Sequence, residues 1–438
     1  MCTLTSLYHP TTREQLDKGM YVWFPKPNSF TGEDVLELHI HGGRAVIHDT
    51  LEAISACDGT RMAEPGEFTK RAFDNDKMDL TEVEGLADLL EAQTHHQRKV
   101  ALSQMQGSIS RFYLQLREDL IRASAYMEAF IDFGDDAEID PEVVEQSRRR
   151  IINLRDRIIQ HLNDGKRGER LRDGAVITII GPPNAGKSSL INLLARRKAS
   201  IVSPIPGTTR DIIEVMLDVG GYPVVIGDTA GIRVSQDVIE QEGVEMAKER
   251  LHRSDIKLCV LDCNTLMEMK TPDALDPLLL QLVDPGTLFI FNKTDLIQSS
   301  TSSQWTRTKQ SIIQQLEQHF KSNTHLHDHI SIPPINSIEL SCSKQEGINQ
   351  LLKQLEISLR EMFEIKDVEA PLLTRLRHKE HLTNCVESLD RYLYHCDDDI
   401  VLASEELRSA IKSIGSISHH VNVDDLLDVI FKDFCIGK

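Results

Sequence analysis

The sequence predicts a multidomain fold, in which an α/β domain with a parallel sheet is inserted into an all-α helical domain and follows a small α+β N-terminal domain. Short apolar runs alternate with helical patterns between residues 173 and 365, which is typical of a doubly wound sheet. Helical periodicity fills residues 80–172 and 366–438 on the two flanks. Because both flanks are helical, we expect them to fold together as one domain.

Local patterns support each region in turn. Residues 1–79 mix turns with strand candidates such as Val35–Ile40, and Pro141 directly after Asp140 predicts the start of a helix. The stretch 298–334 is polar and rich in Ser and His, which predicts a surface insertion. The expected buried helix faces are Val83, Leu86 and Leu90; Leu114, Ile121 and Ala125; Leu407, Ala410, Ile411 and Ile414; and Leu427, Ile430 and Phe431.

A glycine-rich loop follows the first apolar run of the inserted region. The run Val176–Ile180 precedes Gly181–Ser188, a G-x-x-x-x-G-K-S sequence, and the helical pattern Leu190–Leu194 follows it. Strand, loop and helix in this order are the context of a P-loop, whose backbone N–H groups cradle phosphates. Lys187 is expected to reach the β- and γ-phosphates and Ser188 to hold Mg²⁺.

Three further motifs each follow a strand candidate of the same region. They are Asp228-Thr229-Ala230-Gly231, Asn292-Lys293-Thr294-Asp295 and Ser341-Cys342-Ser343-Lys344. Asp228 is expected in the magnesium shell and Gly231 at the γ-phosphate. The Asp295 carboxylate can accept two N–H groups of guanine, which adenine cannot offer, and the last motif closes the base site. With the P-loop, these motifs predict GTP or GDP rather than an unspecified nucleoside triphosphate.

The segment Gly207–Asp211 lies between the P-loop and Asp228 and is expected to act as a switch. Thr209 is predicted to join Mg²⁺ when the γ-phosphate is present, and Thr208 is the alternative on spacing. The full set expected to contact GTP is Asn184, Ala185, Gly186, Lys187, Ser188, Ser189, Ser203, Gly207, Thr208, Thr209, Asp228, Thr229, Ala230, Gly231, Asn292, Lys293, Asp295, Ser341, Cys342 and Ser343.

The residue after Gly231 is Ile232, at the position where a Ras-type GTPase places the glutamine that orients the attacking water. Isoleucine cannot do this, so hydrolysis needs another group to position water and another source of positive charge. The candidates in sequence are the carboxylates of Asp237, Glu240, Glu242 and Glu245 and the guanidinium groups of Arg210 and Arg233, all of which could instead simply solvate a switch helix.

Further signatures stand in order along the chain. Before the P-loop lie Trp23–Asp34, His41-Gly42-Gly43, Pro65–Phe73 and Asn75–Leu80, and the chain ends Phe434-Cys435-Ile436-Gly437-Lys438. Together with the Pro-Asn-Ala-Gly-Lys-Ser-Ser form of the P-loop, they resemble the tRNA-modification GTPases of MnmE (TrmE) type, and especially the mitochondrial members. The resemblance covers nearly the whole chain.

The resemblance implies a potassium-dependent mechanism. K⁺ would lie near the β- and γ-phosphates, held by Asn184, Ser203, Ile205 and Thr208. Glu240 matches the family's water-orienting glutamate, so Glu240, Lys187 and Thr209 are the expected catalytic residues. Two GTPase domains are expected to meet in a homodimer when GTP and K⁺ bind.

The resemblance also implies a tetrahydrofolate site lined by Glu37, Lys77 and Lys438, with Cys435 as the family's functional cysteine. From the residues alone, Cys435 could also be an ordinary thiol on a frayed tail. Family members normally begin with further sequence that includes a folate-contacting arginine. The α+β domain of this chain is therefore expected to be partial.

Composition describes an ordinary globular protein, with 40% hydrophobic and 27% charged residues and no run long enough to span a membrane. The net charge of −19 argues against RNA binding by bulk electrostatics. One basic stretch, from Arg148 to Arg172, is either an RNA-facing strip or a solvated helix face. His325, His327 and His329 alternate in a polar loop, where a metal site is possible but a solvated loop is favoured.

The eight cysteines are scattered without C-x-x-C pairs, which indicates reduced thiols in an intracellular compartment. No presequence is visible at Met1. The resemblance implies the mitochondrial matrix, and the alternative is the cytoplasm.

Two functions are consistent with this sequence. By resemblance, the first is a GTP-hydrolysing subunit that acts with an FAD-binding MnmG-type partner on C5 of the tRNA wobble uridine (position 34). The product would be of taurinomethyl or carboxymethylaminomethyl type, with folate as the one-carbon source. The alternative is a regulatory or ribosome-assembly GTPase that binds RNA without modifying it. The second should carry a basic RNA-binding module such as a KH domain, of which the sequence has no sign.

Overall fold

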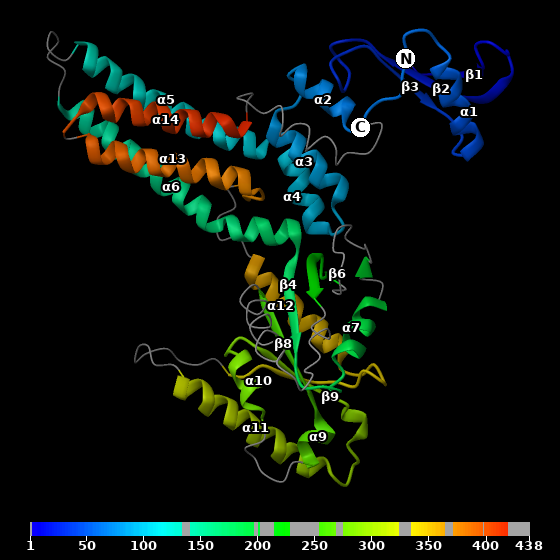
Figure 1. The fold of residues 1–438 in the computed structure, drawn as a ribbon, viewed down its shortest axis with the longest axis vertical. Helices are drawn as coiled ribbons and strands as arrows, with labels where there is room; N and C mark the ends of the chain where they lie inside the picture. The colour runs from blue at the N-terminus through cyan, green and yellow to red at the C-terminus, as the bar shows by residue number, and fades with distance from the viewer. Residues whose placement is uncertain are drawn as a thin grey trace, which may run out of the picture. The chain divides into compact units, whose positions relative to one another are not determined.

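The computed structural model describes residues 2–133, 141–196, 200–201, 214–227, 254–268, 275–323, 334–363, 371–396 and 398–418. Internal packing divides the chain into two compact units. Unit 1 comprises Met1–Glu91, Val100–Asn163 and Leu376–Lys438, and unit 2 comprises Ala92–Lys99 and Asp164–Arg375 (Figure 1). The chain therefore enters unit 2 briefly at Ala92–Lys99, returns to unit 1, and then builds most of unit 2 as one long insertion, Asp164–Arg375.

Unit 1 begins with an antiparallel sheet of β1 (Cys2–Tyr8), β2 (Gln15–Phe24) and β3 (Val35–His39), in that order. Helices α1 (Arg44–Ser55) and α2 (Glu67–Asp74) follow. The Glu67 carboxylate accepts hydrogen bonds from Arg61, from Arg71 and from the backbone of Glu64, which together hold its pKa at about 2. Arg71 also donates to Glu33 at 2.9 Å, so two of the sequence signatures meet in space.

The helical part of unit 1 is built from helices of both flanks, of which α4 and α6 lie partly in unit 2. Their bounds are α3 (Leu80–Glu91), α4 (His95–Met105), α5 (Ser108–Phe133), α6 (Pro141–Asp173), α13 (Leu376–His395) and α14 (Ile400–Ser418). Helix α6 starts at Pro141, as predicted. On α14, Leu407, Ala410 and Ile414 of the predicted stripe are buried, and Ile411 is only partly buried. On α3, Val83 and Leu86 are buried as predicted, but Leu90 is 44% exposed. The predicted stripe of Leu427, Ile430 and Phe431 lies outside the described residues.

The predicted face of α5 is wrong. Ile121 is 39% exposed and Ala125 is exposed, whereas the buried residues are Tyr113, Leu116, Leu120, Ala123 and Met127. Their alternating spacing of three and four residues is that of a helix seam. Apolar residues occur on several sides of α5, so the sequence alone did not single out this seam.

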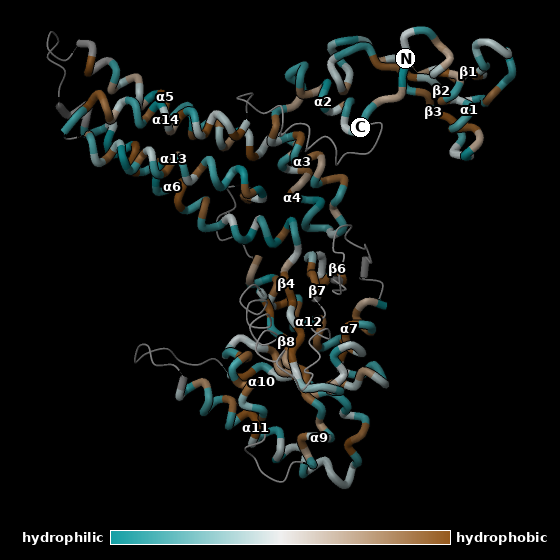
Figure 2. Tube along the Cα trace, viewed as in Figure 1, coloured by the Kyte–Doolittle hydropathy of each residue, from teal (hydrophilic) through white to brown (hydrophobic). Residues whose placement is uncertain are grey.

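Unit 2 contains a seven-stranded sheet in the order β10-β9-β8-β4-β7-β6-β5. Strands β10, β9, β8, β4 and β7 are parallel neighbours, and β6 and β5 are antiparallel. Their bounds are β4 (Ala175–Ile180), β5 (Ser200–Ile201), β6 (Glu214–Val219), β7 (Tyr222–Gly227), β8 (Ile256–Asp262), β9 (Leu288–Asn292) and β10 (Ser337–Glu339). The parallel strands are predominantly hydrophobic, as Figure 2 shows for β4 and β8.

The helices of unit 2 are α7 (Lys187–Arg196), α9 (Cys263–Glu268), α10 (Pro277–Leu282), the short η2 (Thr294–Leu296), α11 (Ser302–Asn323) and α12 (Ile348–Phe363). Helix α11 corrects the prediction of a surface insertion at 298–334. Its Trp305, Ile312, Leu316 and Phe320 are buried in the hydrophobic cluster that contains Phe289 and Phe291 of β9. A polar segment with four apolar residues at helical spacing is enough to cover one edge of a sheet.

Candidate guanine-nucleotide site

The loop after β4 has a backbone that depends on glycine. Gly181 has φ +143° and Gly186 has φ +102°, and Asn184 between them is also left-handed at φ +60°. A Cβ atom on Gly181 would lie 2.1 Å from the carbonyl oxygen of Val260 on β8. The loop backbone therefore packs directly on the neighbouring strand, with no room for a side chain at Gly181. A backbone of this shape can turn its N–H groups toward a phosphate.

Lys187 is the first residue of α7, and its side chain folds back over the loop. Its Nζ donates to the carbonyl oxygens of Gly181 at 2.7 Å and Pro182 at 2.8 Å. The ammonium group therefore lies at the helix N-terminus, where positive potential and loop N–H groups converge. Ser188 and Ser189 follow it in the first turn, and both are exposed.

Asn292 at the end of β9 joins three parts of the site. Its buried amide donates from Nδ2 to the Ala185 carbonyl at 2.8 Å. Its Oδ1 accepts the backbone N–H of Cys342 at 3.2 Å. A Cβ atom on Gly186 would lie 2.1 Å from the same Nδ2. One side chain therefore fixes the phosphate loop and the base loop to each other.

Asp295 and the loop after β10 form the second half of the site. The Asp295 carboxylate accepts Ser341 Oγ at 2.6 Å and Ser343 Oγ at 2.9 Å. The Ser341 hydrogen bond, outweighing burial and aided by Ser343, lowers the pKa of Asp295 below its ordinary value. An ionised carboxylate is an acceptor only, which matches the two N–H donors on the edge of guanine.

Asp262, at the end of β8, is a site residue that sequence reasoning missed. Lys293 has φ +66°, and its Nζ contacts Asp262 Oδ2 at 2.7 Å. Burial would raise the pKa of Asp262, but the Lys293 ammonium and the backbone N–H of Asn264 hold it below the ordinary value. The available signal was a polar residue at the carboxyl end of a central parallel strand, where ligands bind in such folds.

Comparison with known proteins shows which family this chain belongs to. The family described as "GTP-binding protein TrmE N-terminus" matches residues 1–77, and "MnmE helical domain" matches residues 80–435. The chain belongs to the MnmE/TrmE family of tRNA modification GTPases. The resemblance stated from the sequence is confirmed, as is the fold class of N-terminal, helical and P-loop GTPase domains.

The MnmE relatives include mitochondrial and bacterial proteins. The chain is 62% identical to "tRNA modification GTPase gtpbp3, mitochondrial" of Dictyostelium discoideum, over 100% of this chain and 86% of that protein. It is 43% identical to "5-taurinomethyluridine-[tRNA] synthase subunit GTPB3, mitochondrial" of Danio rerio, over 100% of this chain and 85% of that protein. It is also 43% identical to "tRNA modification GTPase MnmE" of Parvibaculum lavamentivorans, over 98% and 88%.

Several predicted site residues of this MnmE-family chain lie outside the described residues. They are Ser203, Ile205, Gly207, Thr208, Thr209, Asp228, Thr229, Ala230, Gly231, Glu240, Cys435 and Lys438. The histidines at 325, 327 and 329 also fall there. The described part of the candidate site is the loop after β4, Asp295 and the loops that hold them.

The two described folate candidates occupy different surroundings. Glu37 on β3 pairs with His39, Oε2 to Nε2 at 3.4 Å, and both side chains are about half exposed. Lys77 is exposed, and its methylene carbons would lie 3.4–3.5 Å from a Cβ on Gly32. No ion pair joins Glu37 to Lys77 in the part of the chain that the structure describes.

The basic stretch of this MnmE-family chain is largely neutralised by its own neighbours. Described partners include Glu145 for Arg149, Asp156 and Asp390 for Arg155, Asp119 for Arg157, Asp164 for Arg167, and Asp255 for Arg170. The Arg150 guanidinium lies over the Tyr126 ring, 5.4 Å from its centroid. Arginines paired in this way attract phosphate weakly, which favours the solvated helix face over the RNA-facing strip.

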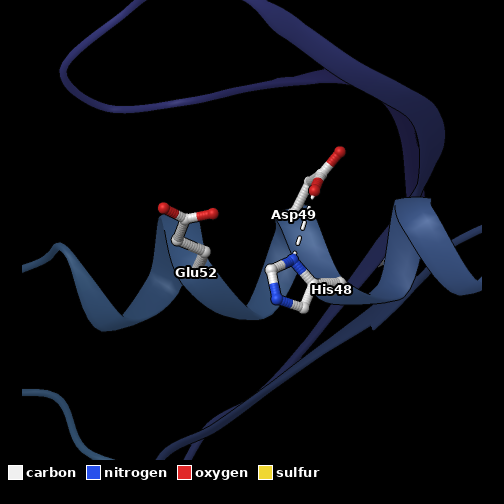
Figure 3. A group of neighbouring side chains, drawn as sticks. All are labelled: His48, Asp49 and Glu52. Atoms are coloured by element: carbon white, nitrogen blue, oxygen red, sulfur yellow. Dashed lines mark hydrogen bonds and ion pairs between the residues drawn. The ribbon is translucent and has the colours of Figure 1, made fainter.

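One group of metal-type ligands occurs in the described residues, namely His48, Asp49 and Glu52 on α1. Figure 3 shows the His48 ring directed toward Asp49, with Nδ1 and Oδ1 3.4 Å apart. All three side chains are exposed, as is usual for polar groups on a helix surface. The described cysteines are all free thiols, and none of the described helices is long and apolar enough to cross a membrane.

Proposed function

We propose that this chain is the GTP-hydrolysing subunit of a complex that modifies C5 of the wobble uridine (position 34) in mitochondrial tRNAs. The product would be of taurinomethyl or carboxymethylaminomethyl type, and the complex would work in the mitochondrial matrix. The observation that carries the proposal is the phosphate-type loop, fixed by Asn292 to the loop that holds Asp295. The chain also matches proteins named tRNA modification GTPases over 98–100% of its length.

The described residues fit GTP and Mg²⁺. The phosphate loop has glycines where a Cβ atom would collide with Val260 or Asn292, so the cradle is formed by backbone alone. Lys187 lies at the helix N-terminus and would exchange its loop carbonyls for the β- and γ-phosphates. Ser188 would hold Mg²⁺ with Thr209, and Asp228 would complete the metal shell.

Hydrolysis would use potassium rather than an arginine finger. K⁺ would supply positive charge beside the β- and γ-phosphates. Its ligands would be Asn184, whose amide oxygen suits a hard cation, with Ser203, Ile205 and Thr208. Glu240 would orient the attacking water, the role that Ile232 cannot fill. Two GTPase domains would meet in a homodimer in this state.

The carbon transfer would belong to the complex. A tetrahydrofolate derivative, supplying one carbon, would be held by Glu37, Lys77 and Lys438, with Cys435 as the functional cysteine. The redox step would belong to an FAD-binding MnmG-type subunit. GTP hydrolysis would order this complex and would not supply the transferred group.

The rival function is a regulatory or ribosome-assembly GTPase that binds RNA. Mass spectrometry of mitochondrial tRNA nucleosides, from cells that lack the chain and from cells that carry Asp295→Ala, separates the two. Loss of the C5 group from wobble uridines in both is expected. Unchanged wobble uridines would refute the modification function and favour the rival.

The potassium mechanism has its own test. GTP turnover of the purified chain is measured in K⁺ and in Na⁺ at equal ionic strength. We expect K⁺ to raise turnover about tenfold or more, since it replaces a group that stabilises transition-state charge. Asn184→Ala should remove this dependence, whereas Asn192→Ala, an exposed asparagine of α7, should keep it. Equal rates in both salts would contradict the mechanism.

A further inference from the structure

The hairpin of β6 and β7 connects the two segments that carry the predicted switch residues. Strand β6 begins directly after residue 213, and β7 ends directly before Asp228. The strands pair along their whole length, from Glu214 with Gly227 to Val219 with Tyr222. Gly220 and Gly221, at φ +63° and +91°, form the two-residue turn. Such a turn matches the twist of its strands, so β6 and β7 form a regular hairpin.

The tip of this hairpin rests on the first turn of α4. The backbone N–H of His96 donates to the Gly221 carbonyl at 3.2 Å. The His96 ring stacks on Tyr222 with centroids 4.2 Å apart and planes 9° apart. Tyr222 stacks in turn on Phe363, the last residue of α12, at 5.0 Å and 5°. A Cβ atom on Gly221 would approach the His96 ring to 3.0 Å, so the turn and the ring fit closely.

The same turn of α4 is fixed to the helix that leads into the phosphate loop. Gln97 Nε2 donates to the Arg172 carbonyl, in the last turn of α6, at 2.8 Å. Gly174 and β4 follow, and β4 runs directly into the loop that begins at Gly181. The first turn of α4 therefore contacts two elements. It contacts the tip of the β6–β7 hairpin, and it contacts the end of α6, three residues before the central strand β4 begins.

The other end of α4 packs on helix α3. A Cβ atom on Gly85 of α3 would lie 2.5 Å from the backbone nitrogen of Met105, so the two helices are in backbone contact. Gln104 Nε2 donates to the Thr81 carbonyl at 3.1 Å. Packing assigns residues 92–99 to unit 2 and residues 100–105 to unit 1. One short helix thus belongs to the GTPase unit at its first turn and to the helical unit at its last.

We propose that His96 is a positioning residue for GTP hydrolysis, whose ring holds the β6–β7 turn on α4 and passes movement of that hairpin into the helical unit. The hairpin would shift at its base with the bound nucleotide and pass this shift to its tip, where the His96 ring contacts the turn on one side and Glu356 of α12 faces Gly220 on the other. Burial lowers the pKa of His96, which keeps the stacked ring neutral near pH 7. The inference rests on GTP hydrolysis and is independent of any tRNA reaction.

The first test separates positioning from nucleotide binding. His96→Ala should lower kcat for GTP by about threefold to tenfold, the factor expected from one aromatic stack, and change the Kd for GDP by less than about twofold. His96→Phe keeps a flat ring on Tyr222 and should restore kcat. Arg98→Ala, at an exposed residue of the same helix, should behave as the unaltered chain. Loss of GDP binding in His96→Ala, or failure of His96→Phe to restore turnover, would overturn the proposal.

The second test has a readout that a purely structural residue would not change. Hydrogen exchange of residues 97–105 is compared with GDP and with a non-hydrolysable GTP analogue bound. In the full chain the two nucleotides should give different exchange in α4, and His96→Ala should remove that difference. Equal exchange with both nucleotides in the unaltered chain, or a difference that survives His96→Ala, would overturn the proposal. Neither readout uses tRNA, so failure of the tRNA function would not imitate either result.

Discussion

At the scale of single residues, Asn292 holds the nucleotide site together. The motif predicted only that this asparagine lies near the base. In the structure its amide bridges the phosphate loop at Ala185 and the base loop at Cys342. A buried amide with both groups bonded costs about 1–3 kcal/mol to disrupt. Asn292 therefore ties the position of the loop after β10 to that of the loop after β4.

Gly186 gives a prediction at this scale. Its φ of +102° excludes a side chain, and so does the Asn292 Nδ2 atom, which would lie 2.1 Å from an added Cβ. Gly186→Ala should weaken GDP binding at least about tenfold, because the loop must move or strain. Titration with a fluorescent GDP analogue measures it. Gly42→Ala, where a Cβ meets nothing within 4 Å, is the control. Equal affinities of the two variants would refute the close packing.

Asp295 gives a second prediction. Asp295→Asn places an N–H₂ group where guanine also donates, so GTP affinity should fall by about tenfold to hundredfold. Xanthosine triphosphate, which has a carbonyl in place of the guanine amine, should then bind better than GTP. Competition binding with both nucleotides measures this preference. Asp173→Asn, at a side chain that is 65% exposed, should leave it unchanged. A variant that still prefers GTP would contradict the assigned role of Asp295.

At the scale of elements, the positions of most helices were predicted better than the residues that each helix buries. The existence of α6 and α14 followed from proline placement and periodicity. The buried seam of α5 was missed, because adjacent residues on a helix point about 100° apart and several sides of α5 are apolar. Helix α11 was missed because its polar composition resembles that of a loop.

Helix α11 provides the element-scale prediction. Leu316 is 1% exposed and belongs to the cluster beneath the sheet edge. Leu316→Ala should lower the free energy of unfolding by about 2–4 kcal/mol, since it removes buried methyl groups and leaves a cavity. Urea unfolding of the full chain measures this. Gln318→Ala, on the exposed side of the same helix, should change stability by less than about 0.5 kcal/mol. Equal effects would mean that α11 does not cover the core.

At the scale of the whole molecule, a buried polar network in the helical unit joins residues that lie almost 300 positions apart in the sequence. Glu84 of α3 accepts from His378 Nε2 at 2.8 Å and from Arg377 at 3.2 Å. Arg377 also donates to the carbonyls of Ser416 and Ile417, at the end of α14. The network therefore joins the first flank to the helix that receives the chain on its return from unit 2.

His161 of α6 lies in the same interior and predicts a pH dependence. Burial, aided by the charge of His378, lowers its pKa to about 4, while the Tyr113 hydroxyl lies 3.3 Å from its Nε2. The unfolded chain would protonate His161 near its ordinary pKa of about 6.5. The unfolded state therefore binds more protons between these values. The associated stability is complete above pH about 6.5 and is lost as the pH falls toward 4, by about 3 kcal/mol in total.

Unfolding free energies at pH 7 and pH 4.5 measure this effect. His161→Gln has no titrating ring and should lose less stability over that interval than the unaltered chain. His48→Gln, at a side chain that is 77% exposed, should show the full loss. Parallel pH curves for all three proteins would show that His161 is not the group responsible.

The sequence by itself determined the order of domains, the strands that precede the four nucleotide motifs and the choice of guanine nucleotide. These follow from periodicity and from motifs a few residues long, whose chemistry is local. Only the tertiary structure decided that Asn292 links the two loops and that Asp262 receives Lys293. It alone also decided that distant aspartates such as Asp255 pair with the basic stretch, and that His96 meets Tyr222. Each of these joins residues that packing brings together from distant parts of the chain, and no local pattern records such a partner.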